Sequence, residues 1–150
     1  MCQVSLTIRK TAVKYTVEYV DIWYGPVEDK PGGLAEKLLP LAAAGFTLDF
    51  LDASRGTGML FVAPVKGVGQ IRVARKTGLQ KATMMRALRI TGRDVSGLGA
   101  QLCQVLGEAG ISFRALAAAV VGKKCSLCFA FDSTEDARKS KRVFRKSLPH

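Results

Sequence analysis

The sequence predicts an α+β protein built from two copies of one small unit. The first observation is an internal repeat, because residues 28–51 align without a gap with residues 93–116 when the sequence is shifted by 65 positions. The second is that alternating apolar residues precede the Asp that both copies share, while apolar residues at helical spacing follow the shared Gly. The third is the composition: 150 residues, 48 % hydrophobic and 23 % charged, suffice for one ordinary domain or two small ones.

Both copies show the element order strand, helix, strand, strand, helix. In the first copy we expect strands at 16–24, 46–53 and 58–65, a helix from Gly32 that ends at Gly45, and a second helix at 67–78. In the second copy we expect strands at 84–91, 111–121 and 123–132, a helix from Gly97 that ends at Gly110, and a second helix at 133–148.

This order is that of a ferredoxin-like βαββαβ unit without its last strand. We therefore expect two ferredoxin-like halves with antiparallel sheets that form an internal pseudo-dimer, divided as residues 1–81 and 82–150. A sheet that lacks its outer strand has an open edge, which soluble proteins usually cover. The segment Gln3–Arg9 alternates like a strand, and we expect it to pair as this extra strand of the first half.

The lengths of the apolar runs and the positions of the cysteines restrict the class of protein. The sequence has no apolar run of transmembrane length and no signal-peptide pattern, so we expect a cytoplasmic protein. Cys125 and Cys128 form a CxxC within a predicted strand, where positions three apart point to opposite faces and cannot bind one metal together. The only histidine is His150. We expect buried structural cysteines and neither metal nor cofactor, with a redox or metal role as the alternative.

The loop that begins the first helix, "DKPGGLAEKL", has a composition suited to holding an anion. A helix N-terminus offers unpaired N–H groups and a partial positive charge, and Gly32 and Gly33 have no side chains to block a carboxylate. Pro31 fixes a helical φ, and Asp29 could cap the turn or accept a ligand's ammonium group. The alternative is that Asp-x-Pro-Gly is only a stable turn.

The motif Asp-x-Pro-Gly-x-Leu-Ala, followed by a helix that ends in Ala-Gly, resembles the ACT domain, a small regulatory module of amino-acid metabolism. The resemblance covers residues 16–148 as a tandem pair without a catalytic domain, although Ser96 replaces the Pro in the second copy. It implies domains that pair through sheets or helices and bind an amino acid near the strand-to-helix loop. The ligand-binding residues it implies are Asp29, Lys30, Pro31, Gly32, Gly33 and Leu34, together with Asp94, Ser96, Gly97 and Leu98.

We therefore expect an amino-acid-binding sensor that regulates a protein partner or pairs with a second copy, and not an enzyme, since no phosphate-binding loop or catalytic cluster is evident. The net charge of +11 leaves a basic RNA-binding or protein-interaction module of ferredoxin-like fold as the alternative. Nucleic acid is disfavoured because Phe129 and Phe131 are expected to face the helices instead of forming a base-stacking surface. The basic residues of the last helix are expected to be solvated.

Overall fold

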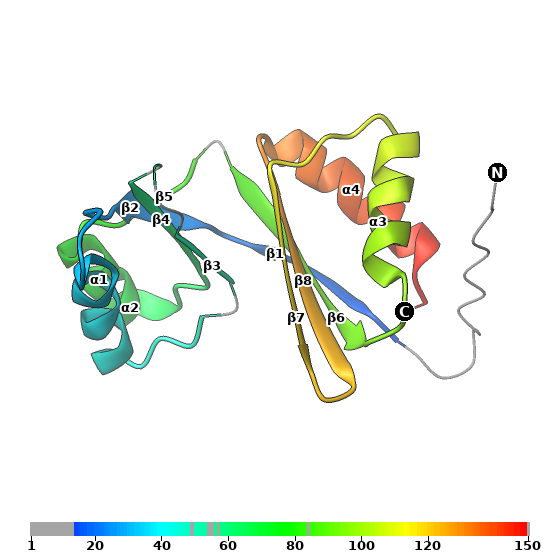
Figure 1. The fold of residues 1–150 in the computed structure, drawn as a ribbon. Coiled ribbons are helices and arrows are strands. Elements are labelled where there is room, and N and C mark those ends of the chain that lie inside the picture. Colours follow the sequence, from blue (N-terminus) through cyan, green and yellow to red (C-terminus); the bar gives the residue numbers. More distant parts are fainter. Residues whose placement is uncertain (1–13, 49, 54–55, 57, 84, 150) are drawn as a thin grey trace. The chain divides into compact units, whose positions relative to one another are not determined.

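The computed structural model describes residues 14–48, 50–53, 56, 58–83 and 85–149, which form two compact units (Figure 1). The contiguous unit is Val20–Arg86. The split unit combines residues 14–19 with the described residues from Ala87 onward. The division therefore differs from the predicted 1–81 and 82–150, because residues 14–19 belong with the second repeat.

The contiguous unit has a four-stranded sheet in the order β3-β4-β2-β5, and helices α1 and α2 cover one face of it (Figure 1). Its core includes Leu41 of α1, Leu60 and Val62 of β4, and Ala74 of α2. Along the chain the elements are β2 (Trp23–Pro26), α1 (Gly33–Ala43), β3 (Phe50–Ala53), β4 (Met59–Ala63), α2 (Gly67–Lys76) and β5 (Gln80–Lys81).

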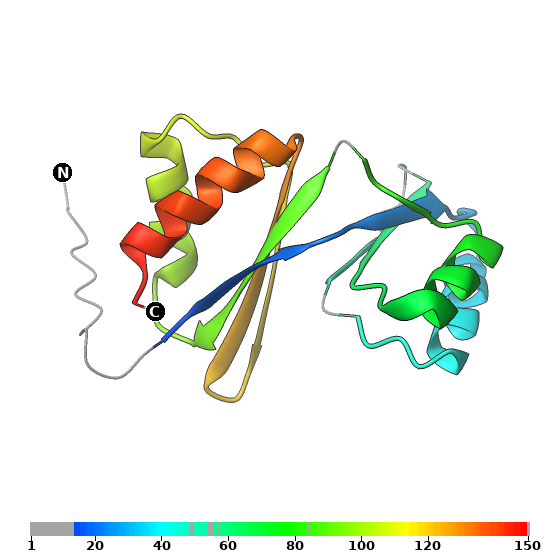
Figure 2. The same ribbon diagram turned by 180° about the vertical axis from the view of Figure 1, so that it is seen from behind.

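The split unit repeats this plan with the strand order β1-β6-β8-β7 and helices α3 and α4 on one face. Figure 2 shows β1 beside β6, although the two strands lie far apart in the sequence. The elements are β1 (Thr16–Val20), β6 (Arg86–Arg93), α3 (Leu98–Glu108), β7 (Ala115–Val121), β8 (Lys124–Phe131) and α4 (Thr134–Ser147). The predicted α+β class with two ferredoxin-like halves is confirmed.

The predicted strand 16–24 is wrong, because the structure divides it into β1 and β2, which belong to different sheets. Ile22 and Trp23 are both buried, so the alternation of exposed and buried residues breaks between the two strands. β5 supplies the fourth strand of the first repeat, and β1 supplies that of the second. The segment Gln3–Arg9, predicted as an extra strand, lies outside the described residues.

Side-chain contacts hold β1 against β6. The hydroxyl groups of Thr16 and Thr91 share a hydrogen bond, and Glu18 pairs with Arg89 at 2.8 Å, so the two strands run in opposite directions. The Tyr15 hydroxyl, just before β1, donates to the carbonyl of Arg93 at 2.8 Å. A Cβ on Gly92 would collide with the Tyr15 ring, so this close packing requires glycine.

Helix α4 begins and packs as its sequence predicts. The Ser133 hydroxyl accepts a hydrogen bond from the Asp136 N–H at 3.0 Å, which satisfies one of the unpaired N–H groups of the first turn. Ala137, Ser140 and Phe144 are fully buried along one face of the helix. The Ser140 Oγ has no hydrogen-bond partner among the described residues, so a buried hydroxyl group is left unsatisfied.

Replacing Ser140 by alanine should stabilise the protein. The change removes a buried unpaired hydroxyl and improves helix propensity, so we expect a gain of about 1 kcal/mol in the free energy of unfolding. Urea unfolding measures this gain. The control is Ser147→Ala on the same helix, whose hydroxyl donates to the Val143 carbonyl at 3.0 Å, and no comparable gain is expected there.

The Tyr15 hydroxyl should make the split unit sensitive to alkali. Burial, followed by the charges of Cys125 and Asp94, raises the pKa of Tyr15. A folded pKa above the unfolded value of about 10 means that this contribution is present below pH 10 and is lost as the pH rises through the folded pKa. Tyr15→Phe should cost about 1 kcal/mol at pH 8 through the lost hydrogen bond. It should also lose less stability than the wild type between pH 8 and 11.

Urea titrations at both pH values measure the two effects. Tyr24→Phe is the control, because Tyr24 stacks on Phe61 in the contiguous unit and its removal should leave the alkaline loss of the wild type intact. Equal alkaline losses in Tyr15→Phe and the wild type would contradict the prediction.

Candidate functional site

The two strand-to-helix loops have the same backbone shape. Gly32 and Gly97 precede α1 and α3 with φ angles of 81° and 83°, in the left-handed region that favours glycine. The N–H of Gly33 donates to the Lys30 carbonyl at 3.0 Å, and the N–H of Leu98 donates to the Val95 carbonyl at 3.1 Å. The 65-residue shift therefore relates the two loops in the conformation of the glycine and in this turn hydrogen bond.

In the first loop, packing explains Gly33, and four of the other predicted residues are exposed. Helix α1 begins at Gly33, so Pro31 lies ahead of the helix instead of at its first position. A Cβ on Gly33 would collide with the Glu28 carbonyl, which explains this glycine without a ligand. Asp29, Lys30, Pro31 and Gly32 are exposed.

Acidic side chains surround the start of α1. The Lys30 ammonium lies 2.9 Å from Glu28 and 3.6 Å from Glu36, which is in the first turn of the helix. The hydrogen bond between Lys30 and Glu28 lowers the pKa of Glu28 and raises the pKa of Lys30. A ligand carboxylate at this helix N-terminus would compete with two carboxylates that are already there.

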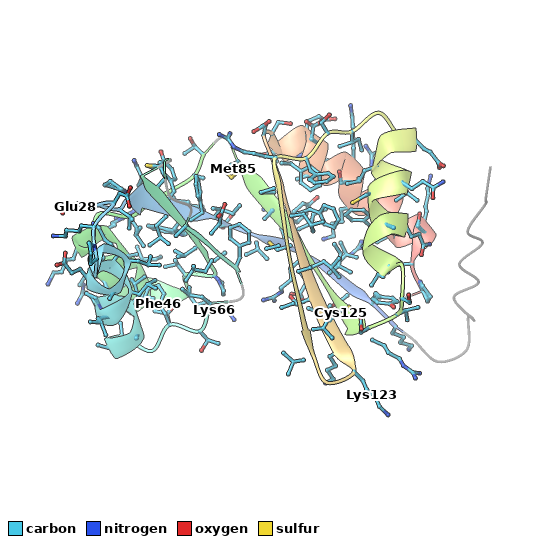
Figure 3. All side chains as sticks on the ribbon, in the orientation of Figure 1. Glu28, Phe46, Lys66, Met85, Lys123 and Cys125 are labelled. Atoms are coloured by element: carbon cyan, nitrogen blue, oxygen red, sulfur yellow. The ribbon has the colours of Figure 1, made fainter. Side chains whose placement is uncertain are left out.

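In the second loop, the predicted residues border a hollow of about 230 Å³. Figure 3 labels Cys125 and Lys123 near the β7–β8 turn, the end of the sheet at which α3 begins. The polar residues of the lining are Asp94, Ser96 and Cys125. The remaining lining is Val95, Gly97, Leu98, Gly99, Ala118, Ala119, Val120 and Leu127, so the hollow is mostly apolar.

One difference between the repeats explains the space beside the second loop. The position of Leu34, which packs against the core of the contiguous unit, is occupied by Gly99 in the split unit. Arg93 and Gln101 of the second repeat stand at the positions of the acidic residues Glu28 and Glu36 of the first. No acidic residue lies in the first turn of α3. The second loop thus combines a helix N-terminus, open space and no flanking carboxylate in the helix.

The turn itself uses one of the N–H groups at the start of α3, and Asp94 is the acidic residue that lines the same hollow. The Leu98 N–H is used within the turn, whereas no hydrogen bond from the N–H of Gly97 or Gly99 is found in the described part of the chain. The first N–H groups of a helix lack an intrahelical partner, and together they carry a partial positive charge. They can therefore bind an anion.

The lining residues that come from β7 and β8 were not predicted from the sequence. Asp94, Ser96, Gly97 and Leu98 were predicted, whereas the strand residues reach the hollow only through tertiary packing. Gly99 was within reach of the sequence, because the alignment of the repeats places it opposite Leu34.

The CxxC cysteines lie on β8, as predicted, and point to opposite faces of it. Cys125 belongs to the core of the split unit, and its Sγ lies 3.7 Å from the Arg93 carbonyl. Burial, with a smaller contribution from Asp94, raises the pKa of Cys125, and burial raises the pKa of Cys128 to about 11. Burial therefore favours the protonated form of both thiols, which is the less nucleophilic form. Within the described ranges, His, Cys, Asp and Glu side chains form no metal-binding group.

A larger hollow of about 350 Å³ lies beside β1 and the end of α4. Its polar side chains are largely engaged within the sheet: Tyr15 with Arg93, Thr16 with Thr91 and Glu18 with Arg89. The smaller hollow is the better candidate, because it combines unpaired N–H groups with an adjacent carboxylate.

The two phenylalanines of β8 face the core, as the sequence predicted. Phe129 and Phe131 are fully buried in the core with Phe144, and are not available to stack on bases. On α4, Arg138 and Lys139 pair with Glu135, and Lys141 lies 4.2 Å above the centre of the Tyr19 ring. No helix within the described ranges has the length and apolar character to cross a membrane.

Comparison of the sequence with protein-family models and with curated proteins finds no match. Solved structures do match the fold. The regulatory subunit of aspartate kinase from Thermus thermophilus, in its ligand-free form, is 16 % identical with a TM-score of 0.58, and the match covers 91 % of this chain and 96 % of that one. A putative C-terminal regulatory domain of aspartate kinase from Porphyromonas gingivalis is 14 % identical with a TM-score of 0.58, covering 93 % and 99 %.

A third match is part of a longer enzyme. It is E. coli aspartokinase III in complex with aspartate and ADP, which is 15 % identical with a TM-score of 0.59 over 91 % of this chain and 33 % of that one. At these identities the likeness concerns the fold. This chain shares the fold of the aspartate kinase regulatory domains, a pair of ACT-type halves, as the resemblance of its strand-to-helix motif implied.

Proposed function

We propose that the chain is a regulatory module that binds a free amino acid at the second strand-to-helix loop and, when it is bound, regulates a protein partner. The observation that carries the proposal is the hollow at the start of α3, whose lining includes Asp94 together with Gly97 and Gly99. No hydrogen bond from the N–H groups of these two glycines is found among the described residues. The fold is one that aspartate kinases use for regulation. We propose no catalytic role for the chain. We expect it to act in the cytoplasm.

The chemistry of the second loop fits both ends of an amino acid. Its α-carboxylate would accept hydrogen bonds from the N–H groups of Gly97 and Gly99, where the helix dipole favours negative charge. Gly97 lines the hollow with a positive φ and has no side chain to block a carboxylate. The Asp94 carboxylate, from the same loop, would accept the ammonium group.

The lining also selects a class of side chain. Apart from Asp94, Ser96 and Cys125 the hollow is lined by aliphatic residues and glycine, which favours an uncharged aliphatic side chain over a charged one. Its volume of about 230 Å³ exceeds the roughly 150 Å³ of a cavity that can hold benzene. A small aliphatic amino acid is therefore the ligand we expect.

The first loop, from Asp29 to Leu34, is the second candidate site. Leu34 occupies the position of Gly99, and Glu28 and Glu36 bring negative charge to the helix N-terminus. We therefore place the ligand in the second repeat, although the Asp-x-Pro-Gly motif is better preserved in the first. A bound ligand would act on a partner by favouring one arrangement of the protein over another through its differential affinity.

A thermal-shift screen of the twenty amino acids tests the proposal. For an affinity of about 1 μM to 1 mM, ligand at 100 times the dissociation constant stabilises the folded state by about 2.7 kcal/mol. This should raise the melting temperature by about 5 to 10 °C. Aliphatic amino acids should give the largest shifts, and no shift with any amino acid would refute the function.

Matched variants locate the site. Gly99→Leu should abolish the shift, because it fills the hollow with the residue type of the first repeat and its nearest neighbour lies 3.8 Å from the new Cβ. Gly107→Leu, the same change on the same helix with nothing within 4 Å, should keep the shift. Asp94→Asn should weaken binding at least about tenfold, whereas Asp29→Asn should not. The opposite result for the two Asp variants would move the site to the first loop.

A further inference from the structure

The outer face of α1 carries a large apolar side chain that the fold does not require. Leu39, near the middle of α1, is 67 % exposed. The 65-residue shift places Gln104 at the same position of α3, where its amide donates a hydrogen bond to Glu108 at 3.2 Å. Because the second repeat has a polar residue at this position of the same fold, packing within the unit does not explain the leucine.

A second exposed apolar side chain lies on the neighbouring helix. Val68, in the first turn of α2, is 76 % exposed. The Lys37 ammonium donates a hydrogen bond to the Thr77 carbonyl at 2.7 Å. The Gln70 amide donates to the Gly45 carbonyl at 3.3 Å, so α1 and α2 lie side by side in opposite directions (Figure 1). The exposed leucine and valine therefore project from one helix layer, on the side away from the sheet.

Unpaired cations accompany these apolar side chains. Val68, Arg72 and Arg75 share the exposed face of α2, since they are spaced by four and three residues. Lys66 directly precedes the helix (Figure 3), and Lys76 is its last residue. The helix contains no acidic residue, and no hydrogen bond or ion pair of these four cationic side chains is found within the described ranges. The face is therefore basic around its apolar residues.

The other basic helix, α4, is less suited to an anionic partner. Arg138 and Lys139 pair with Glu135 in the first turns of α4, and Lys141 lies over the Tyr19 ring. None of the exposed large apolar residues in the described part of the chain lies on α4. Cations and exposed apolar side chains therefore occur together on α1 and α2, and not on α4.

We propose that the outer face of α1 and α2 binds an anionic lipid surface, with Leu39 and Val68 inserted among the headgroups and the cations of α2 on the phosphates. A helix that lies in the membrane interface directs apolar side chains toward the acyl chains and keeps Lys and Arg at the level of the headgroups. The long stems of Arg72 and Arg75 allow this separation on one helix face. The lipid face does not depend on the amino-acid site of the proposed function.

A lipid surface fits this face better than a protein partner does. Protein interfaces are centred on side chains that fill a pocket of the partner, and neither of the two hollows described above involves α1 or α2. An anionic bilayer presents negative charge without a fixed pattern, so two single apolar side chains among cations match it without a complementary shape.

Co-sedimentation of the full chain with lipid vesicles tests the charge. Phosphatidylcholine vesicles with about 30 % phosphatidylserine should bind the wild type, and pure phosphatidylcholine vesicles should not. Replacing Arg72 and Arg75 together by glutamine should lower the partition coefficient by about fivefold for each arginine. The control replaces Arg142 and Arg145 of α4 by glutamine, which removes the same two charges at the same spacing, and should bind like the wild type. A wild type that does not bind, or equal losses in both double variants, would overturn the proposal.

A single substitution tests the apolar contribution. Leu39→Gln introduces the residue of the second repeat and should lower the partition coefficient by about tenfold, because an inserted leucine is lost. The reciprocal Gln104→Leu on α3 should not strengthen binding. Unchanged binding of Leu39→Gln would show attraction of a polycation to charge alone and would contradict insertion. The melting-temperature shift with amino acids should be the same in Leu39→Gln and the wild type, so this proposal and the proposed function can fail separately.

Tryptophan fluorescence reports insertion directly. The emission of Leu39→Trp should shift to shorter wavelength when anionic vesicles are added, whereas that of Gln104→Trp, at the equivalent position of α3, should not. Trp23 is the only tryptophan of the chain and is buried, so its emission should stay unchanged. Equal shifts in the two variants, or no shift in Leu39→Trp, would rule out the proposed orientation.

Discussion

The pairing of β1 with β6 is the contact on which the architecture depends. A ferredoxin-like half needs four strands, and the second repeat contains only three of its own. The strand that completes it comes from the start of the described chain and is held by the Glu18–Arg89 pair and by Tyr15, packed against Gly92. Without this strand β6 would be an open edge beside the buried core of the split unit.

The two repeats show how one backbone can serve two purposes. Their loops share the same glycine conformation and the same turn hydrogen bond. Their surroundings differ through a few side chains: a leucine fills the space beside the first loop and a glycine leaves it open beside the second, while glutamates near α1 give way to uncharged or basic residues near α3. The same loop conformation is thus packed against a leucine in the first repeat and lies beside a hollow in the second.

Local patterns in the sequence predicted most of the elements and the fold class. Gly45 and Gly110, with φ angles of 78° and 71°, follow the helices as predicted, and Ser133 caps α4. The partner of a strand is a non-local property, and alternation alone could not assign residues 16–20 to the second sheet. The hollow was missed in part for the same reason, because the contribution of Ala118 to Val120 depends on the pairing of β7 with β8.

The split unit is discontinuous along the chain, and this sets the order in which its strands can pair during translation. β1 leaves the ribosome before β6, and Glu18 is separated from its partner Arg89 by 71 residues. At a synthesis rate of about 5 to 20 residues per second, β6 is synthesised about 4 to 14 seconds after β1. The contiguous unit is synthesised whole in that interval. It can therefore fold before the split unit is complete, while β1 stays accessible to chaperones until β6 emerges.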